Sequence, residues 1–206
     1  NAMMNRTVQC PSCGSPIELA HRNVKVVKCE ACDSVSAIEK DGVDPLGESA
    51  TLTDFFSALT LGAVASVNGR RFQAMGRLRF EYADGYWDEW YLLFDDGTDA
   101  WLVEDEGELT MVQPVPVPGN PPHPSQLRAG ETFELPGHTV YVVEVGQAKL
   151  IGMEGQLPRG HFIGLTMDYL DATSNGQSFM LEYTNSEVEC FVGHDITFDD
   201  IQLENQ

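Results

Sequence analysis

The sequence is short of positive charge: its 206 residues carry 12 Lys and Arg against 32 Asp and Glu, a formal net charge of −20. Residues 1–40 hold five of the bases and four of the acids, which leaves 7 bases and 28 acids in residues 41–206. Such a surface repels phosphate backbones and anionic lipid headgroups. We therefore expect no nucleic acid on the body of the protein and favour cationic partners: a basic protein patch, a polyamine or a divalent metal. An acidic coat that only aids solubility is the alternative.

Long apolar runs are absent too. None approaches the roughly 18 residues of a membrane span, and Met3 to Gln9 is polar and lacks the apolar core of a signal peptide. We expect a cytoplasmic protein with no direct membrane insertion. The sequence also lacks a nucleophile elbow, a phosphate loop and a dinucleotide fingerprint, and its histidines have no metal-binding or catalytic spacing.

Cysteine is scarce, but four of the five cysteines form two C-x-x-C pairs, Cys10 with Cys13 and Cys29 with Cys32, separated by 15 residues. This spacing predicts a zinc ribbon over residues 3–40, in which two tight turns bring four thiolates onto one tetrahedral ion. Four thiolates leave no open coordination position, so we predict structural Zn²⁺ rather than a catalytic metal. A redox role would want a thioredoxin-like setting, which the sequence does not have. The fifth cysteine, Cys190, is expected to be an inert buried thiol.

Short apolar runs separated by turns predict a mainly β body over residues 50–206, barrel-like or sandwich-like. All three tryptophans fall within residues 86–102, where two aromatic runs flank an Asp-Asp-Gly turn and predict a β-hairpin. Apolar residues at helical spacing predict one short helix near residues 51–60. The other predicted strands are Ala63–Val67, Arg71–Tyr82, Val140–Val145, Lys149–Met153, Phe162–Leu170, Ser178–Tyr183, Val188–Val192 and Ile196–Phe198.

A proline-rich connector, residues 114–126, divides the body into two halves, 60–113 and 127–205. Gly62 and Gly130, like Gly69 and Gly137, are separated by the same 68 residues. This correspondence predicts two similar antiparallel β units that arose by duplication, although glycine turns also align by chance.

Several short motifs in the body resemble those of a known bacterial family. They are Leu61-Gly62, Asn68-Gly69-Arg70, Met75-Gly76-Arg77-Leu78, Trp87-Asp88-Glu89-Trp90-Tyr91-Leu92 and Ala100-Trp101-Leu102. Over about residues 50–205 the chain is similar to domain-of-unknown-function family 4178, in which a cysteine ribbon in front of the domain is familiar. The resemblance implies a β-rich accessory protein of bacteria and gives no residue a catalytic role.

Strand 71–82 carries an unusual row of arginines on the face opposite its apolar residues. Cross-strand pairing with Asp88 and Glu89 would neutralise the row. The alternative is a binding face made of Arg77, Arg79, Glu89, Trp90 and Trp101. We therefore predict a non-enzymatic, zinc-containing binding module for a protein or a small, cationic ligand. The competing hypothesis is a hydrolase or ligand-processing enzyme whose site assembles from Glu89, His138 or His194.

Overall fold

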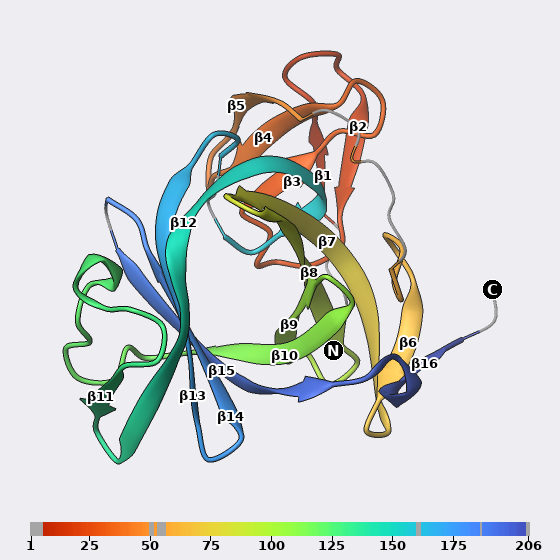
Figure 1. Cartoon of the computed structure of the whole chain (residues 1–206). Helices are drawn as coiled ribbons and strands as arrows, with labels where there is room; N and C mark the ends of the chain where they lie inside the picture. Colours follow the sequence, from red (N-terminus) through yellow and green to blue (C-terminus); the bar gives the residue numbers. More distant parts are fainter. Residues whose placement is uncertain (1–5, 50–51, 53–56, 160–161, 186, 205–206) are drawn as a thin grey trace.

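The computed structural model describes residues 6–49, 52, 57–159, 162–185 and 187–204. Within them, eight strands form a closed antiparallel barrel (Figure 1). In order around the barrel they are β7 (Arg70–Tyr82), β8 (Gly85–Phe94), β9 (Asp99–Asp105), β10 (Glu108–Val115), β15 (Val188–Ile196), β14 (Gln177–Tyr183), β13 (Thr166–Ser174) and β12 (His138–Leu157). The barrel closes because β12 pairs with β7 as well as with β13. Each half of the body thus supplies four consecutive strands, and the duplication itself stays a prediction.

Strand β12 bends around the seam of the barrel. Its register shifts twice, at Val143 and at Ile151. Such bulges bend a strand sharply, and curvature of this kind is what a closed barrel needs. The two strands predicted at Val140–Val145 and Lys149–Met153 are therefore parts of one strand of 20 residues.

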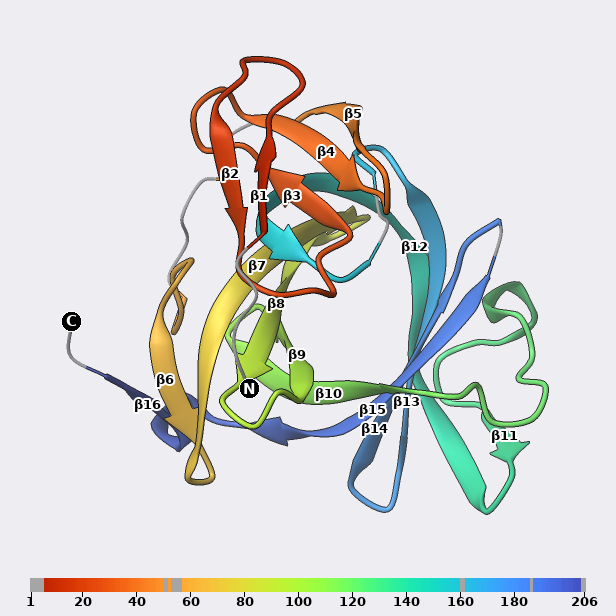
Figure 2. The same cartoon turned by 180° about the vertical axis from the view of Figure 1, so that it is seen from behind.

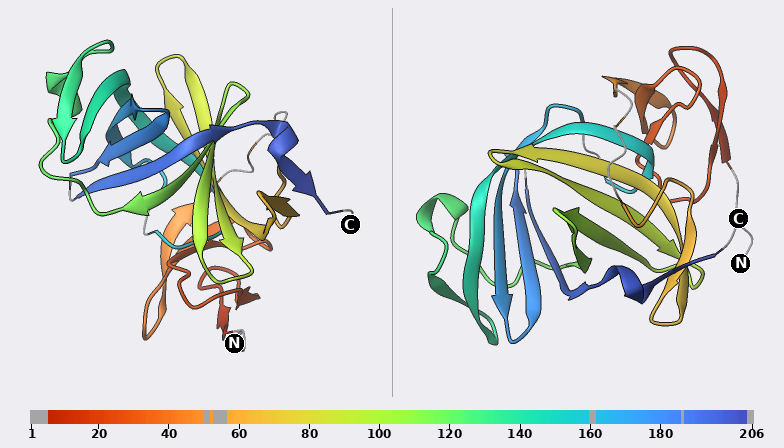
Figure 3. Two further views of the ribbon diagram at one scale, coloured as in Figure 1. Left: turned by 90° about the horizontal axis from the view of Figure 1, so that it is seen from below. Right: turned by 45° about the vertical axis from the view of Figure 1, so that its right-hand side comes forward.

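Three short strands extend the barrel at its sides. β6 (Val64–Val67) pairs with β7, β16 (Ile201–Leu203) pairs with β6, and β11 (Thr132–Leu135) pairs with the first residues of β12. Figure 3 shows β6 and β16 on the opposite side of the barrel from β11. The strands β6 and β16 cover the outer face of β7 to β10, which would otherwise expose a large apolar surface.

The amino-terminal strands form a small unit over one end of the barrel (Figure 2). β1 (Arg6–Gln9) pairs with β2 (Pro16–Leu19), and a second sheet contains β3 (Val26–Lys28), β4 (Ser34–Ile38) and β5 (Val43–Glu48). β3 also pairs with the end of β12. There the Gln156 side chain donates to the carbonyl of Glu18 and accepts from the amide of Ala20, each at 2.8 Å. Backbone and side-chain hydrogen bonds therefore join this unit to the barrel.

Two apolar clusters pack on the two faces of the β7–β10 sheet. The cluster on the lumen side includes Leu78, Phe80, Trp87, Tyr91, Trp101, Leu150 and Met153. The outer cluster includes Phe72, Ala74, Trp90, Leu92 and Leu102, with Ala65, Val67 and Ile201 from β6 and β16. Strand β7 contributes to both clusters because its register shifts at Met75, and a bulge turns the alternation over.

Half of the helix predicted near residues 51–60 falls on residues 51 and 53–56, which lie outside the described residues. Its described end, Ser57 to Thr60, is not helical. In the described part of the chain the helices are two short 3₁₀ turns, η1 (Pro124–Gln126) and η2 (Phe198–Asp200). Neither has the length or the apolar content to cross a membrane. The strand predicted at Phe162–Leu170 begins four residues later, as β13 at Thr166.

A substitution at Gly193 tests the packing between β10, β15 and β14. A Cβ atom at this residue would lie 1.8 Å from the backbone oxygen of Met111. Backbone atoms of a paired strand cannot rotate away, so we expect Gly193→Ala to lower the free energy of unfolding by about 2 kcal/mol or more, measured by urea denaturation. Gly42→Ala is the control, because nothing lies within 4 Å of its Cβ position. Equal stability of the two variants would contradict this packing.

Candidate metal centre and barrel cavity

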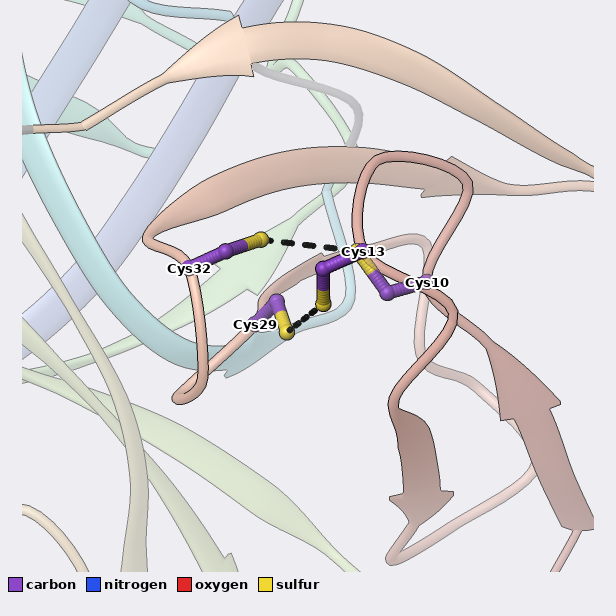
Figure 4. Close-up of side chains that lie close together, drawn as sticks. All are labelled: Cys10, Cys13, Cys29 and Cys32. Atoms are coloured by element: carbon purple, nitrogen blue, oxygen red, sulfur yellow. Dashed lines mark hydrogen bonds between the residues drawn. The ribbon is translucent and has the colours of Figure 1, made fainter.

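Four cysteine side chains converge in the amino-terminal unit (Figure 4). Their sulfur atoms lie within 4.8 Å of one another, with 3.7 Å between Cys10 and Cys32 and 3.9 Å between Cys13 and Cys29. Four sulfurs at about 2.3 Å from a tetrahedral zinc ion would be about 3.8 Å apart. The separations of these two pairs fit a tetrahedral ion with bonds of that length.

The two turns that carry the cysteines are built alike. The carbonyl of Cys10 accepts a hydrogen bond from the amide of Gly14, and the carbonyl of Cys29 accepts one from Asp33, both at 2.9 Å. Gly14 has a φ of 76° and Asp33 a φ of 59°. The second turn departs from glycine, but Asp adopts the left-handed conformation more readily than most residues. Local backbone geometry thus aims each pair of thiols toward the other.

A hydroxyl group supports the sulfur cluster. The Oγ of Ser34 lies 3.1 Å from the sulfurs of both Cys10 and Cys32. Burial raises the pKa of the Cys10 thiol, but hydrogen bonds from Ser34 and from the backbone outweigh it and lower that pKa to about 6. Burial raises the pKa of the Cys29 thiol to about 11. A soft metal cation would hold all four groups as thiolates, so the cluster is a candidate metal centre.

The barrel holds a second candidate site, a cavity of about 330 Å³ in its lumen. Aromatic side chains form part of its wall, among them Tyr82, Trp87 and Tyr169. The ring of Trp87 packs edge-on against Tyr169, with 5.1 Å between the centroids. Small β-barrels either fill the lumen with side chains or leave room for one small ligand. This barrel leaves room.

The charged residues that line the cavity are acidic. The described residues that line it include no Lys, Arg or His, and seven carry carboxyl groups: Glu89, Asp105, Glu108, Glu144, Asp171, Glu182 and Asp195. Burial raises the pKa of Asp171 to about 7, and the nearby Glu144, Glu182 and Asp105 add to the shift. Burial, followed by the charge of Glu106, raises the pKa of Asp105 to about 6. The cavity therefore gathers carboxyl groups whose negative charge is opposed by burial and by the neighbouring acids.

Arg159 lies beside the inner part of the cavity, with its side chain 11% exposed. Its guanidinium donates to Glu182 at 2.6 Å and to Glu189, and its Nη1 lies 3.8 Å from a carboxylate oxygen of Glu89. The guanidinium carbon also lies 4.8 Å from the ring centroid of Phe191 and 5.4 Å from that of Trp101. Three carboxylates and two aromatic rings thus surround one cation.

The five residues of the predicted binding face do not share a surface. Arg77 and Arg79 are 2% and 4% exposed and lie on the outer side of the sheet. Both pair with Asp88 there, Arg79 through two hydrogen bonds at 2.6 and 2.8 Å, and Arg77 also binds Glu154 at 2.9 Å. Cross-strand pairing with Asp88 is confirmed. The guanidinium of Arg77 stacks over Trp90 in the outer layer.

Glu89, which was predicted to pair with the arginines alongside Asp88, lies on the opposite face of the sheet. Glu89 faces the lumen, where it accepts a hydrogen bond from Trp87 at 2.9 Å and meets Arg159. Burial and the charge of Glu182 raise the pKa of Glu89, and the charge of Arg159 opposes them. Trp101 is buried on the same side, beneath Arg159.

The histidines named in the enzyme hypothesis do not join Glu89. Neither lines the lumen cavity. His138 packs its ring against Phe179, with centroids 5.0 Å apart. His194 lies at a smaller outer hollow with Arg70 and Gln113. The structure therefore places these three residues at separate sites.

Sequence reasoning missed Arg159 and Asp171. Arg159 follows a proline after β12, a setting that is typical of a surface loop, and its acidic partners come from β8, β14 and β15. Asp171 lies in β13, two residues after Tyr169 and four after Met167. An acid on the same strand face as Met167 and Tyr169 was the available signal, because those residues indicate an inward face.

A model of the family described as a domain of unknown function, DUF4178, matches residues 60–198, which is more than half of the chain. The matched segment contains all eight barrel strands and leaves out the cysteine unit. No curated protein and no solved structure matches the chain significantly.

Proposed function

The chain belongs to the DUF4178 family, and on that premise we propose that it is a non-enzymatic binding module of the bacterial cytoplasm whose barrel takes up a small ligand. The observation that carries the proposal is the lumen cavity. Its volume of about 330 Å³ lies at the lower end of the range of about 300–1,000 Å³ for small-molecule sites. Its wall combines aromatic side chains with converging polar groups, which is the usual composition of such a site.

We further propose that the four cysteines hold a structural zinc ion. Zinc would supply a closed tetrahedral centre that fixes the two turns and performs no chemistry on a substrate. Cys10, Cys13, Cys29 and Cys32 would be its ligands, and Ser34 would orient two of the thiolates. The observation in favour is the agreement between the sulfur separations and a tetrahedron of Zn–S bonds.

A set of matched probes tests uptake into the lumen. The probes are a linear aliphatic diamine, the diol of the same chain length and the dicarboxylate of that length. The test protein is the full chain, and the variant is Ser178→Trp, which places an indole where Ser178 lines the cavity. We expect at least one probe to raise the melting temperature of the wild type in a concentration-dependent way and to leave the variant unchanged. Equal shifts in both proteins, or no shift with any probe, would refute uptake.

A further inference from the structure

The lumen cavity has seven carboxyl groups in its wall, and Arg159 lies close to two of them, Glu89 and Glu182. Asp171 is half-buried, lines the cavity and receives no hydrogen bond or ion pair from any described residue. Glu144 lies nearby and accepts a hydrogen bond from Tyr169 at 2.7 Å. Carboxylates that are partly withdrawn from water and have no partner favour a cation beside them or the neutral form. Neither is paired with a described base, and Arg159 beside the cavity pairs with Glu182, Glu189 and Glu89 instead.

The barrel already surrounds one cation, the guanidinium group of Arg159, with carboxylates and aromatic rings. Arg159 occupies the neighbouring part of the lumen, between the carboxylates of Glu182, Glu189 and Glu89 and above two aromatic rings. Carboxylates neutralise the charge of an organic cation, and ring faces attract it further. The empty space beyond Arg159 repeats this combination with Asp171, Glu144 and the rings of Trp87 and Tyr169. This part of the cavity therefore has the carboxyl groups and rings that surround Arg159, but no basic side chain of the described residues lines it.

The spacing of the acids distinguishes an organic cation from a metal ion. Among the described residues, the four cysteines are the one group of three or more potential ligands whose donor atoms come within 4.8 Å of one another. The lumen carboxylates do not form a second group of this kind among the described residues. They extend from Glu89, which is buried, and Asp171, which is half-buried, to Glu108 and Asp195, which are exposed at the rim. Charges distributed along a passage fit a ligand whose own charges are separated.

We propose that the lumen binds a linear aliphatic amine with two or more ammonium groups. One ammonium group would lie against Asp171 and Glu144, and a second would reach the rim acids Glu108 and Asp195. The methylene chain between them would contact Trp87 and Tyr169. This inference rests on the proposed function, since it names the ligand class of the same cavity.

Isothermal titration calorimetry of the full chain with a linear triamine tests the inference. We expect Asp171→Asn to raise the dissociation constant at least tenfold, and Glu144→Gln, which can still accept from Tyr169, to raise it by a smaller factor. Asp44→Asn is the matched control, because it removes the same charge from an exposed position in β5. It should leave the dissociation constant unchanged. The diol should not bind.

The outcomes separate this inference from the proposed function. If Asp171→Asn, Glu144→Gln and Asp44→Asn weaken the amine equally, the amine binds to the acidic surface and the inference is wrong. If the diol or the dicarboxylate enters the lumen and amines do not, the ligand class is wrong while the binding module stands. If no probe of any charge binds, both fail. Circular dichroism of each variant confirms that the barrel is folded, and the Glu144 variant provides the answer should the Asp171 variant not fold.

Discussion

Replacement of Cys29 by serine is expected to abolish metal binding and unfold the amino-terminal unit. About 30 residues cannot bury enough surface to fold alone, so the free energy of metal binding becomes folding free energy. The loss should reach the barrel, because β3 pairs with the end of β12 and Val26 and Val35 belong to the lumen-side cluster. We expect the free energy of unfolding to fall by more than about 3 kcal/mol.

Elemental analysis and chemical denaturation measure the two effects. The wild type should contain one zinc per chain, and Cys29→Ser should contain almost none. Cys190→Ala is the control for loss of a thiol, since Cys190 is buried in the barrel strand β15. It should keep its zinc. A wild type without metal whose amino-terminal amides stay protected from hydrogen exchange would show that the cysteines hold the unit without an ion.

The convergence of the four cysteines was predictable because its determinants are local. Each C-x-x-C pair sets its own turn, and Gly14 and Asp33 supply the left-handed residue that the turn needs. Bringing the pairs together requires only a hairpin-sized connection. The prediction of four converging cysteines is confirmed. The identity of the ion stays a proposal because sulfur geometry alone admits more than one soft metal.

The mainly β architecture and the tryptophan hairpin were predictable from the same kind of local pattern. β8 and β9 pair as expected, Tyr91 opposite Trp101, and the family resemblance is confirmed over residues 60–198. Closure of the barrel was not predictable, since it depends on pairing between β7 and β12, which are distant in sequence. Alternation within a strand says which side is apolar and leaves open which strand completes the sheet.

The arginine row shows where alternation misleads. One extra residue at Met75 exchanges the two faces of β7, so Arg77 and Arg79 lie beneath the outer layer instead of in water. A bulge is invisible to a count of alternating residues. The same alternation on β8 sends Asp88 outward to these arginines and Glu89 inward to the lumen. The proposed ligand site is therefore built from acids that looked like surface charge in the sequence.

Replacement of Arg159 by methionine is expected to destabilise the barrel by about 3–5 kcal/mol. Methionine fills much of the same space but leaves Glu89, Glu182 and Glu189 without the cation that they share. The penalty should depend on pH. Arg159 now lowers the pKa of Glu89 against the effects of burial and Glu182, so that pKa should rise further in the variant. Where an acid has a raised pKa in the folded state, the protein loses stability as the pH rises through that pKa. The protein regains this stability at lower pH.

Urea denaturation at about pH 7 and at about pH 9.5, on either side of the Glu89 pKa of about 8, measures both parts of this expectation. Arg128→Met is the matched control, since Arg128 is exposed in the connection before β11 and should cost little at either pH. The difference in the free energy of unfolding between the two variants should be larger at the higher pH. Adding Glu89→Gln to Arg159→Met should restore part of the lost free energy, because it removes one uncompensated charge. If the Arg159 variant is no less stable than the Arg128 variant, then the guanidinium does not compensate the lumen acids. The barrel would then tolerate its negative charge without a cation, which would remove the internal precedent for amine binding.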